Sequence, residues 1–161
     1  MGGQDVEKHE IERIISLYSD SVLKTAFSYV KNTCDAQDIA QDVFVSLIYR
    51  KKPFMSEEHI KAWLLRVTIN KSKNFLKSSW HTKRSKMPEF LPCLDEEENF
   101  LLSEIMKLDA KYRIPLHLFY YEGYSIKEIA EILKKKPSTV GSYLDRGRKK
   151  LKDILGGDAC E

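Results

Sequence analysis

Apolar residues recur at steps of three or four through most of this 161-residue chain, and this spacing limits its fold more than any other feature. Such steps place apolar side chains on one face of a helix, whereas a half-buried strand needs strict alternation. The first apolar face consists of Ile11, Ile15, Tyr18, Val22, Ala26 and Tyr29. No alternation of any length competes with the helical spacing. The chain is therefore predicted to be all-α.

Two further helices are predicted in the first half of the chain. One begins at Asp35, an N-cap residue type with acidic Asp38 three residues later. Its buried side comprises Ile39, Ala40, Val43, Phe44, Leu47 and Ile48. The other is capped by Ser56, and its core side is marked by Ile60, Trp63, Leu64 and Val67.

Charge is distributed unevenly along the chain. The net charge of +3 divides into −3 for residues 1–50, +8 for 51–86, −6 for 87–110 and +4 for 111–161. The acidic block contains two prolines and four consecutive acids, Asp95 to Glu98, which disfavours regular structure. We therefore predict a linker over residues 85–98, between small helical domains at 6–84 and 99–157.

Several classes of function are disfavoured by what the sequence contains. Its 42% apolar content allows a buried core, and three scattered cysteines suggest neither a disulfide framework nor a zinc site. Without a long apolar run or a signal-peptide pattern, the protein is expected to be soluble and cytoplasmic. The four histidines lack H-x-x-x-H spacing, and phosphate-loop and G-x-S-x-G motifs are absent. We expect no enzyme activity, cofactor, metal or small-molecule substrate.

The third predicted helix carries the first sign of nucleic-acid binding. Arg66, Asn70, Lys73 and Lys77 form one stripe, with Asn74 beside it. Basic side chains neutralise phosphates, and an Asn amide pairs with base edges. Two alternatives stay open: a solvated basic face, or Asn70 and Asn74 as satisfied polar groups at the edge of the core.

The segment before that helix adds basic and aromatic residues. Lys51 and Lys52 precede Phe54, a combination that suits single-stranded DNA, whose bases stack on aromatic rings. Trp63 belongs more naturally to the core, and Phe54 could also lie there.

Near the C-terminus, EILKKKPSTVGSYLDRGRKKL breaks one helical pattern and begins another. Ser125 and Glu128 form a capping box for the first of the two helices, and the lysines before Pro137 end it. Ser138 is predicted to cap the second, whose buried side comprises Val140, Tyr143 or Leu144, Leu151, Ile154 and Leu155. Its outward side comprises Thr139, Gly141, Ser142, Asp145, Arg146, Arg148, Lys149 and Lys150. The arrangement predicts a DNA-binding helix-turn-helix, with a plain helical hairpin as the alternative.

Three blocks in this order resemble the small, extracytoplasmic-function group of bacterial sigma factors. The blocks are DAQDIAQDVFVSLIYR, IKAWLLRVTINKSKNFLK and, after the acidic segment, LDAKYRIPLHLFYYEGYSIKEIAEILKKKPSTVGSYLDRGRKKLK. The resemblance covers nearly the whole chain. It implies a factor that binds core RNA polymerase, melts promoters and directs initiation, and that is held inactive by an anti-sigma factor.

The resemblance also implies roles for particular residues. Docking on the β′ clamp helices falls to Asp35, Asp38, Gln41 and Asp42, and facing the β flap falls to Leu116 and Phe119. Minus-ten DNA falls to Lys51, Lys52, Phe54, Arg66, Asn70, Lys73, Asn74 and Lys77, with the loop from Lys51 to Ser56 receiving a flipped-out base. Minus-thirty-five DNA falls to Ser138, Thr139, Gly141, Ser142, Tyr143, Arg146, Arg148 and Lys149.

Some positions depart from the pattern of that group. Gly141 stands where a basic residue is usual, and Asp145 would repel a nearby phosphate. Pro115 lies within a helical pattern and indicates a kink or a late helix start. A conventional helix-turn-helix regulator, which would bind a two-fold operator without polymerase, is the remaining alternative.

Overall fold

The computed structural model describes residues 2–78 and 95–156, with side chains from Glu7 onward, and within these ranges the chain forms seven helices and no strand. The chain divides into two compact units, an N-terminal unit (Met1–Thr82) and a C-terminal unit (Lys83–Glu161). The prediction of an all-α fold with two small helical domains is confirmed. None of the helices in the described ranges has both the length and the apolar content that crossing a membrane requires.

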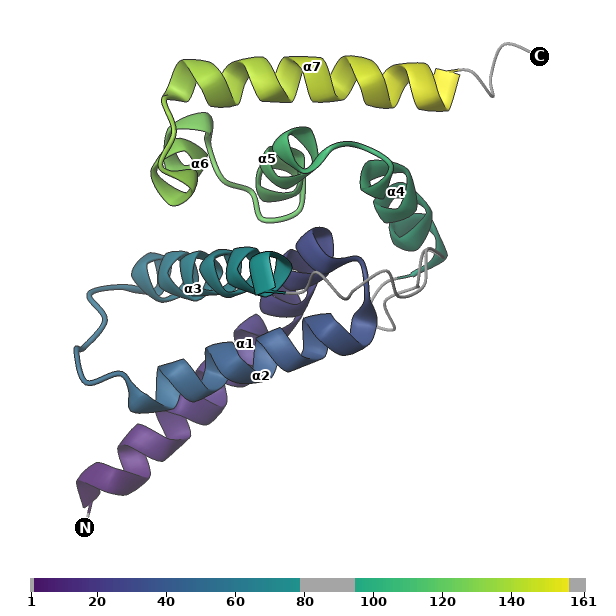
Figure 1. The fold of residues 1–161 in the computed structure, drawn as a ribbon. Helices are drawn as coiled ribbons and strands as arrows, with labels where there is room; N and C mark the ends of the chain where they lie inside the picture. The colour runs from purple at the N-terminus through teal and green to yellow at the C-terminus, as the bar shows by residue number, and fades with distance from the viewer. Residues whose placement is uncertain (1, 79–94, 157–161) are drawn as a thin grey trace. The chain divides into compact units, whose positions relative to one another are not determined.

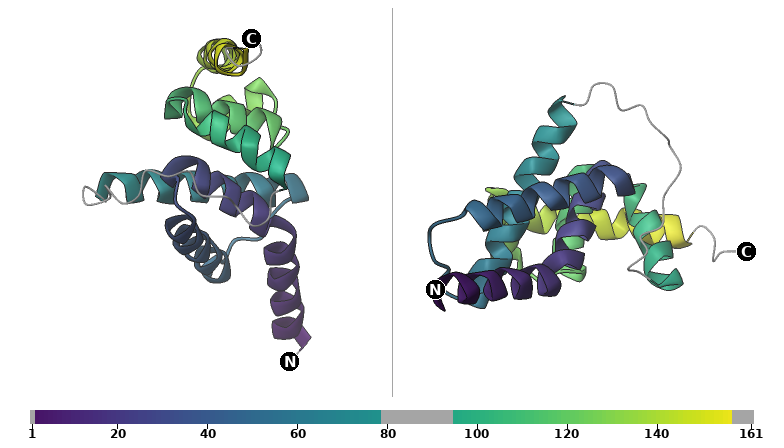
Figure 2. Two further views of the ribbon diagram at one scale, coloured as in Figure 1. Left: turned by 90° about the vertical axis from the view of Figure 1, so that its right-hand side faces the viewer. Right: turned by 90° about the horizontal axis from the view of Figure 1, so that it is seen from below.

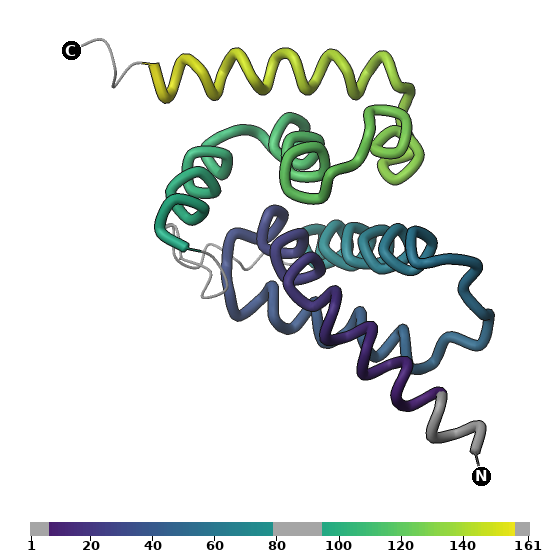
Figure 3. The backbone as a smooth tube through the Cα atoms, turned by 180° about the vertical axis from the view of Figure 1, so that it is seen from behind, coloured from purple at the N-terminus to yellow at the C-terminus, as the bar shows by residue number. Residues whose placement is uncertain are grey.

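The N-terminal unit consists of α1 (Gly2–Val30), α2 (Thr33–Tyr49) and α3 (Glu57–Ser78). Each of these helices packs on the other two, as Figure 1 shows from one side and Figure 3 from behind. Their shared core comprises Ile14, Val22, Ala26, Phe27, Ala36, Ile39, Val43, Leu47, Ile60, Leu64, Leu65 and Ile69. Tyr29 and Ala40 are buried beside these residues, as are the polar Thr25, Ser28, Thr68 and Ser72.

The start of α2 differs from its prediction. The N-cap residue is Asn32, whose Oδ1 accepts a hydrogen bond of 2.9 Å from the Asp35 backbone N–H. Asp35 therefore lies in the first helical turn, where its charge is favourable near the helix N-terminus. The prediction of Asp35 as the cap is wrong because Asn32 offers the same capping chemistry three residues earlier. Ser56, in contrast, accepts a hydrogen bond from the His59 N–H at the start of α3, as a cap does.

Parts of the predicted buried faces are also wrong. On α2, Phe44 is half-buried and Ile48 is 53% exposed. On α3, Trp63 and Val67 are half-buried, while Leu65, Thr68 and Ile69 are buried beside Leu64. The reason is that α3 packs against both α1 and α2, so that its buried face is wider than one apolar stripe.

The C-terminal unit consists of α4 (Glu96–Met106), α5 (Ala110–Tyr120), α6 (Ile126–Leu133) and α7 (Pro137–Gly156). Helix α7 packs on α4, α5 and α6, and the left view of Figure 2 shows it nearly end-on with α5 and α6 on one side. The core comprises Leu102, Ile105, Met106, Leu108, Tyr112, Ile114, Leu116, Leu118, Ile129, Ala130, Ile132, Leu133, Val140 and Leu144. One side of α7 is thereby left free of the other helices of this unit.

The acidic run predicted to be irregular instead begins a helix. Asp95 caps α4, and its side chain accepts a hydrogen bond of 2.8 Å from the Glu98 N–H. The Glu98 carboxylate accepts one of 3.1 Å from the Asp95 N–H, completing a capping box. Acids are stabilising in the first turn of a helix, so the run favours helix formation here. The rest of the predicted linker, residues 85–94, lies outside the described residues.

The turn between α6 and α7 follows the predicted helix-turn-helix with one correction. The capping box of Ser125 and Glu128 is confirmed, with hydrogen bonds of 2.8 Å and 3.2 Å. Helix α6 ends at Leu133, and its C-cap residue Lys134 adopts a left-handed conformation with φ of 55°. Helix α7 begins at Pro137, so the prediction of Ser138 as its cap is wrong. Proline is favoured at the first helical position because its fixed φ suits the helix and no N–H bond is lost.

Helices α5 and α7 approach each other closely at a glycine. A Cβ atom at Gly147 would lie 2.9 Å from Leu116 Cδ1 and 3.3 Å from Tyr112 Cβ. Gly147 is buried, and the lack of a side chain permits this contact. The close approach at Gly147 places α7 across α5 and leaves the opposite side of α7 outward.

Helix α5 begins five residues before Pro115, so the prediction of a late helix start at the proline is also wrong.

Candidate nucleic-acid and partner interfaces

The stripe on α3 lies on the surface of the N-terminal unit. Arg66, Asn70, Lys73, Asn74 and Lys77 are all exposed, opposite the side that carries Leu64, Leu65 and Thr68. The alternative that Asn70 and Asn74 lie at the edge of the core is therefore wrong, and the alternative of a solvated basic face stays open. Exposed cations along one side of a helix suit a phosphate backbone, and two amides among them can reach base edges.

The loop between α2 and α3 is organised around two aromatic rings. The rings of Phe54 and Trp63 meet edge to face with centroids 5.5 Å apart, and His59 contacts Phe54 at 5.4 Å. The Arg50 guanidinium lies 4.4 Å from the Phe54 centroid and 4.9 Å from that of Trp63. Both rings are half-buried, so they are neither fully exposed for stacking nor fully part of the core. Lys51 and Lys52 are exposed beside them.

A second group of side chains joins the start of α3 to α1. The Glu57 carboxylate accepts hydrogen bonds of 2.6 Å from Arg13 and 2.8 Å from the Tyr18 hydroxyl. These bonds, the first from Arg13, lower the pKa of Glu57 below its usual value. Burial, and then the bond to Glu57, raises the pKa of Tyr18 to about 12. The pairs are solvent-exposed and contribute little to stability, but they connect the first residue of α3 to α1.

One face of α2 combines acidic and apolar residues on the surface. Asp38, Gln41 and Asp42 are exposed, and Asp35 is half-buried at the start of the helix. The same face continues with Val45, Ile48 and Tyr49, which are 48%, 53% and 78% exposed. We call these six residues, from Asp38 to Tyr49, the α2 face. The sequence analysis did not predict that Val45, Ile48 and Tyr49 belong to this surface. Their spacing of three or four residues continues that of the acids and could have indicated it.

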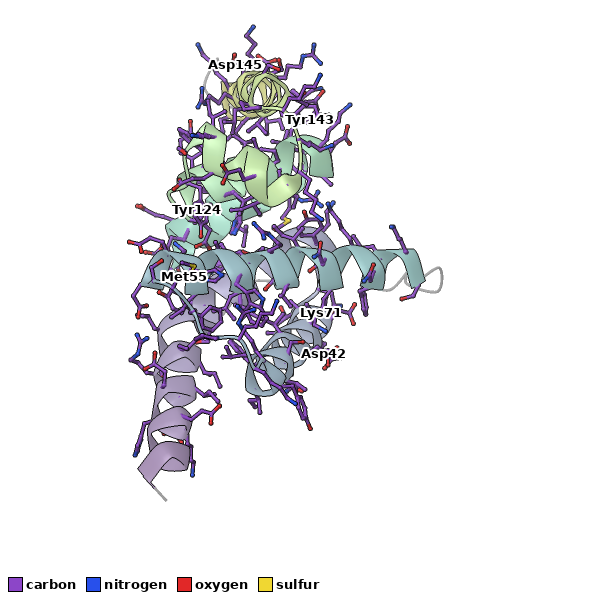
Figure 4. The ribbon with its side chains drawn as sticks, turned by 90° about the vertical axis from the view of Figure 1, so that its left-hand side faces the viewer. Asp42, Met55, Lys71, Tyr124, Tyr143 and Asp145 are labelled. Carbon is purple, nitrogen blue, oxygen red and sulfur yellow. The ribbon has the colours of Figure 1, made fainter. Side chains whose placement is uncertain are left out.

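The outward side of α7 carries small, polar and basic side chains. Ser138, Ser142, Asp145, Arg146 and Lys149 are exposed there, and Thr139 and Gly141 are half-buried. Tyr143 is also half-buried but turns toward α5, where its ring meets that of Tyr112 edge to face with centroids 5.9 Å apart. Figure 4 shows Asp145 on the side of α7 turned away from the neighbouring helices of its unit. This side is open and has the residue types of a DNA-reading helix.

Arg148, like Tyr143, contacts α5. Its Nε donates a hydrogen bond of 2.8 Å to the Tyr120 hydroxyl on α5, and its guanidinium lies 5.2 Å from the Phe119 ring. It also contacts Asp145 at 3.4 Å. Arg148 is therefore held toward α5, and the exposed Arg146 is better placed for DNA.

One residue predicted to face a partner protein is inaccessible. The Leu116 side chain is fully buried in the C-terminal core, so its prediction as a direct contact is wrong. Phe119 on the same helix is half-buried. Beyond it lies an open groove with a volume of about 440 Å³, lined by Tyr120, Arg148, Leu151, Lys152, Leu155 and Gly156. Leu155, predicted to be buried, is instead part of this partly exposed apolar surface.

The two units match two domains of one family. Residues 14–82 match the family described as sigma-70 region 2, and residues 101–151 match sigma-70 region 4. The chain is 34% identical over 147 residues to the RNA polymerase sigma factor SigZ of Bacillus subtilis, covering 84% of this chain and 81% of SigZ. It is 25% identical over 162 residues to the ECF RNA polymerase sigma factor SigW of the same organism, covering 88% and 87%.

Solved structures support the fold. The sigma factor RpoE of Bartonella quintana, solved in complex with the anti-sigma factor NepR, matches with a TM-score of 0.77 and 18% identity, covering 91% of this chain and 97% of RpoE. CnrH, solved with the cytosolic domain of CnrY, matches with a TM-score of 0.66 and 23% identity, covering 94% and 90%.

Proposed function

Because this chain belongs to the sigma-70 family, in its extracytoplasmic-function group, and directs promoter-specific transcription initiation, we propose that its two units divide that task. The N-terminal unit binds polymerase, recognises the minus-ten element and melts it, and the C-terminal unit reads the minus-thirty-five element as duplex. The observation that carries this proposal is the exposed stripe on α3, in a unit other than that of the open side of α7.

The proposed melting step needs no nucleotide hydrolysis and no cofactor. Opening a duplex replaces base stacking with contacts to protein, and a basic surface with stacking partners supplies them. The α3 stripe, with Lys51 and Lys52, provides the basic surface, and Phe54 and Trp63 provide the rings. We assign the protein no catalytic reaction of its own, and place it in the cytoplasm, where polymerase acts.

In vitro transcription with purified core polymerase on a promoter library tests the proposal as a whole. We expect initiation at discrete start sites from promoters that share two separated elements. A readout of permanganate-sensitive thymines at the downstream element tests melting separately. Initiation without a shared downstream element, or a closed downstream element in productive complexes, would contradict the assignment to the α3 stripe.

Polymerase docking is proposed for the α2 face together with Asp35. Replacing both Asp38 and Asp42 by alanine is expected to weaken binding to core polymerase by about 2- to 30-fold, since exposed charges contribute roughly 0.2–1 kcal/mol each. The loss should diminish at high salt, which screens such charges. Titration of labelled chain with core polymerase at two salt concentrations measures both effects. An affinity unchanged at low salt would refute the docking role of these acids.

Reading of the upstream duplex is proposed for the outward side of α7. Arg146→Ala is expected to weaken binding to the upstream element by about 1–3 kcal/mol if Arg146 makes a bidentate contact with a guanine. The loss should be concentrated at one base pair, because a base contact specifies and a phosphate contact only positions. Competition between promoter fragments that differ at single positions measures this. An equal loss on every fragment would identify a phosphate contact.

Two partner contacts complete the proposal. The groove beside Phe119 is assigned to the β flap, in place of the buried Leu116, because its apolar lining is accessible. An anti-sigma factor is also proposed, since RpoE and CnrH, which share this fold, were each solved with a partner, which for RpoE is an anti-sigma factor. Exposed apolar residues such as Ile48 and Tyr49 need cover when polymerase is absent, and such a factor would provide it.

A further inference from the structure

We propose that Arg50 is a positioning residue that holds the 51–56 loop in a shape that presents Met55 to a displaced promoter base. The inference rests on the minus-ten role proposed above for this loop. It concerns two residues that the sequence patterns did not single out, one at the end of α2 and one at the tip of the loop. Figure 4 shows Met55 where the loop leads into α3.

The Arg50 side chain contacts the loop at two points. Its Nε donates a hydrogen bond of 3.0 Å to the Lys52 carbonyl, which fixes the loop backbone directly after α2. Its guanidinium lies 4.4 Å from the Phe54 ring centroid and 4.9 Å from that of Trp63. Trp63 is on α3, so one side chain joins the end of α2, the loop and the next helix. A planar guanidinium can stack and donate at once, and a lysine ammonium cannot do both in this way.

The far end of the loop is held separately. The Met55 backbone N–H donates a hydrogen bond of 3.1 Å to His59 Nδ1, and the His59 N–H donates one of 3.1 Å to Ser56 Oγ. The His59 ring also packs on Phe54 at 5.4 Å. Glu57, the first residue of α3, is bound to Arg13 and Tyr18 of α1. The loop is thus fixed at both ends before any nucleic acid binds.

The Met55 side chain takes no part in the contacts that hold the loop. It is 92% exposed, more than any other large apolar side chain in the described residues, although its backbone is held. Contact with a ligand would explain why a flexible thioether is exposed to water while its backbone is held in place. A base has an apolar, polarisable face that suits a methionine sulfur. The exposed Lys51 and Lys52 beside it suit the phosphates of the same strand.

Binding of polymerase holoenzyme to single-stranded non-template fragments, with each minus-ten base changed in turn, tests the proposal. We expect Met55→Ala and Arg50→Lys both to reduce base discrimination about tenfold, at the same single position, with the salt dependence of binding unchanged. Lys51→Ala is the matched control: it should weaken binding to all fragments alike and lower the salt slope by about one phosphate contact. Affinity for the isolated upstream duplex should be the same in all four proteins.

Hydrogen exchange in the free full-length chain tests, without DNA, whether Arg50 holds the loop backbone in place. The Met55 amide is expected to exchange at least tenfold faster in Arg50→Lys, while the melting temperature and the amides of Leu64 and Leu65 stay unchanged. An unchanged Met55 amide would overturn the positioning role, as would Arg50→Lys with full base discrimination or with the uniform loss expected of Lys51→Ala. If instead Met55→Ala leaves every base preference intact, Met55 does not contact a displaced base and the proposal is overturned. If Lys51→Ala also binds every fragment as the unchanged protein does, the minus-ten role of the loop itself fails.

Discussion

Gly147→Val is expected to destabilise the C-terminal unit by about 3 kcal/mol, because the place of its side chain is already filled. A Cβ atom alone would lie 2.9 Å from Leu116 Cδ1 and 3.3 Å from Tyr112 Cβ. Leu116 is fully buried and cannot move away without disturbing the core. Overpacking of this kind costs roughly 1–3 kcal/mol, and the two further methyl groups of valine place the change at the upper end. Chemical denaturation followed by circular dichroism measures the loss.

Gly141 on the same helix provides the matched control. Apart from the neighbouring residues and backbone of α7 itself, no atom lies within 4 Å of a Cβ built there, so Gly141→Ala should stabilise the unit by about 1 kcal/mol through helix propensity. Substitution is therefore expected to lower the stability of the unit at Gly147 and to raise it at Gly141. Stabilisation by Gly147→Val, or an equal effect of alanine at both positions, would contradict the close contact between α5 and α7.

Tyr49→Ala is expected to weaken binding to core polymerase by about 2–4 kcal/mol, more than the loss of two acids on the same helix. Tyr49 is 78% exposed and follows Val45 and Ile48 along the α2 face. Tyrosine is one of the residue types enriched at the few positions that carry most of the binding energy of an interface. The effect should appear mainly as faster dissociation, and it should depend little on salt.

Leu17→Ala is the control for that measurement. Leu17 on α1 is 58% exposed and apolar but is not part of the α2 face, so its loss should leave the polymerase affinity unchanged. Surface plasmon resonance with immobilised core polymerase gives both rates for each variant. Equal losses for Tyr49→Ala and Leu17→Ala would show that the binding surface is not confined to the α2 face.

The sequence predicted the features that depend on local chemistry. Helical spacing alone was enough for the all-α class, and the capping box of Ser125 and Glu128 placed the start of α6 correctly. The exposed stripe on α3 follows from the same spacing, since residues three or four apart share a side. Order and spacing of the three motif blocks then indicated the family.

Features that depend on packing between helices could not be predicted in this way. Leu116 resembled a partner contact until the approach of Gly147 showed that it is enclosed. Ile48 fitted the apolar face of α2, yet the other two helices cover only part of that face. Capping errors at Asp35 and Ser138 have a different, local cause: Asn32 supplies the capping oxygen three residues before Asp35, and Pro137 already occupies the first helical position before Ser138.

The two cores of this chain are built from different helices, and damage to one need not spread to the other. On the docking role proposed for the α2 face, a copy with a collapsed C-terminal unit would still occupy polymerase without delivering it to an upstream element. Such a copy would be a competitor and not a silent loss. In a mixed population it would depress the genes of its own regulon, and also those of other factors that share the same pool of core enzyme.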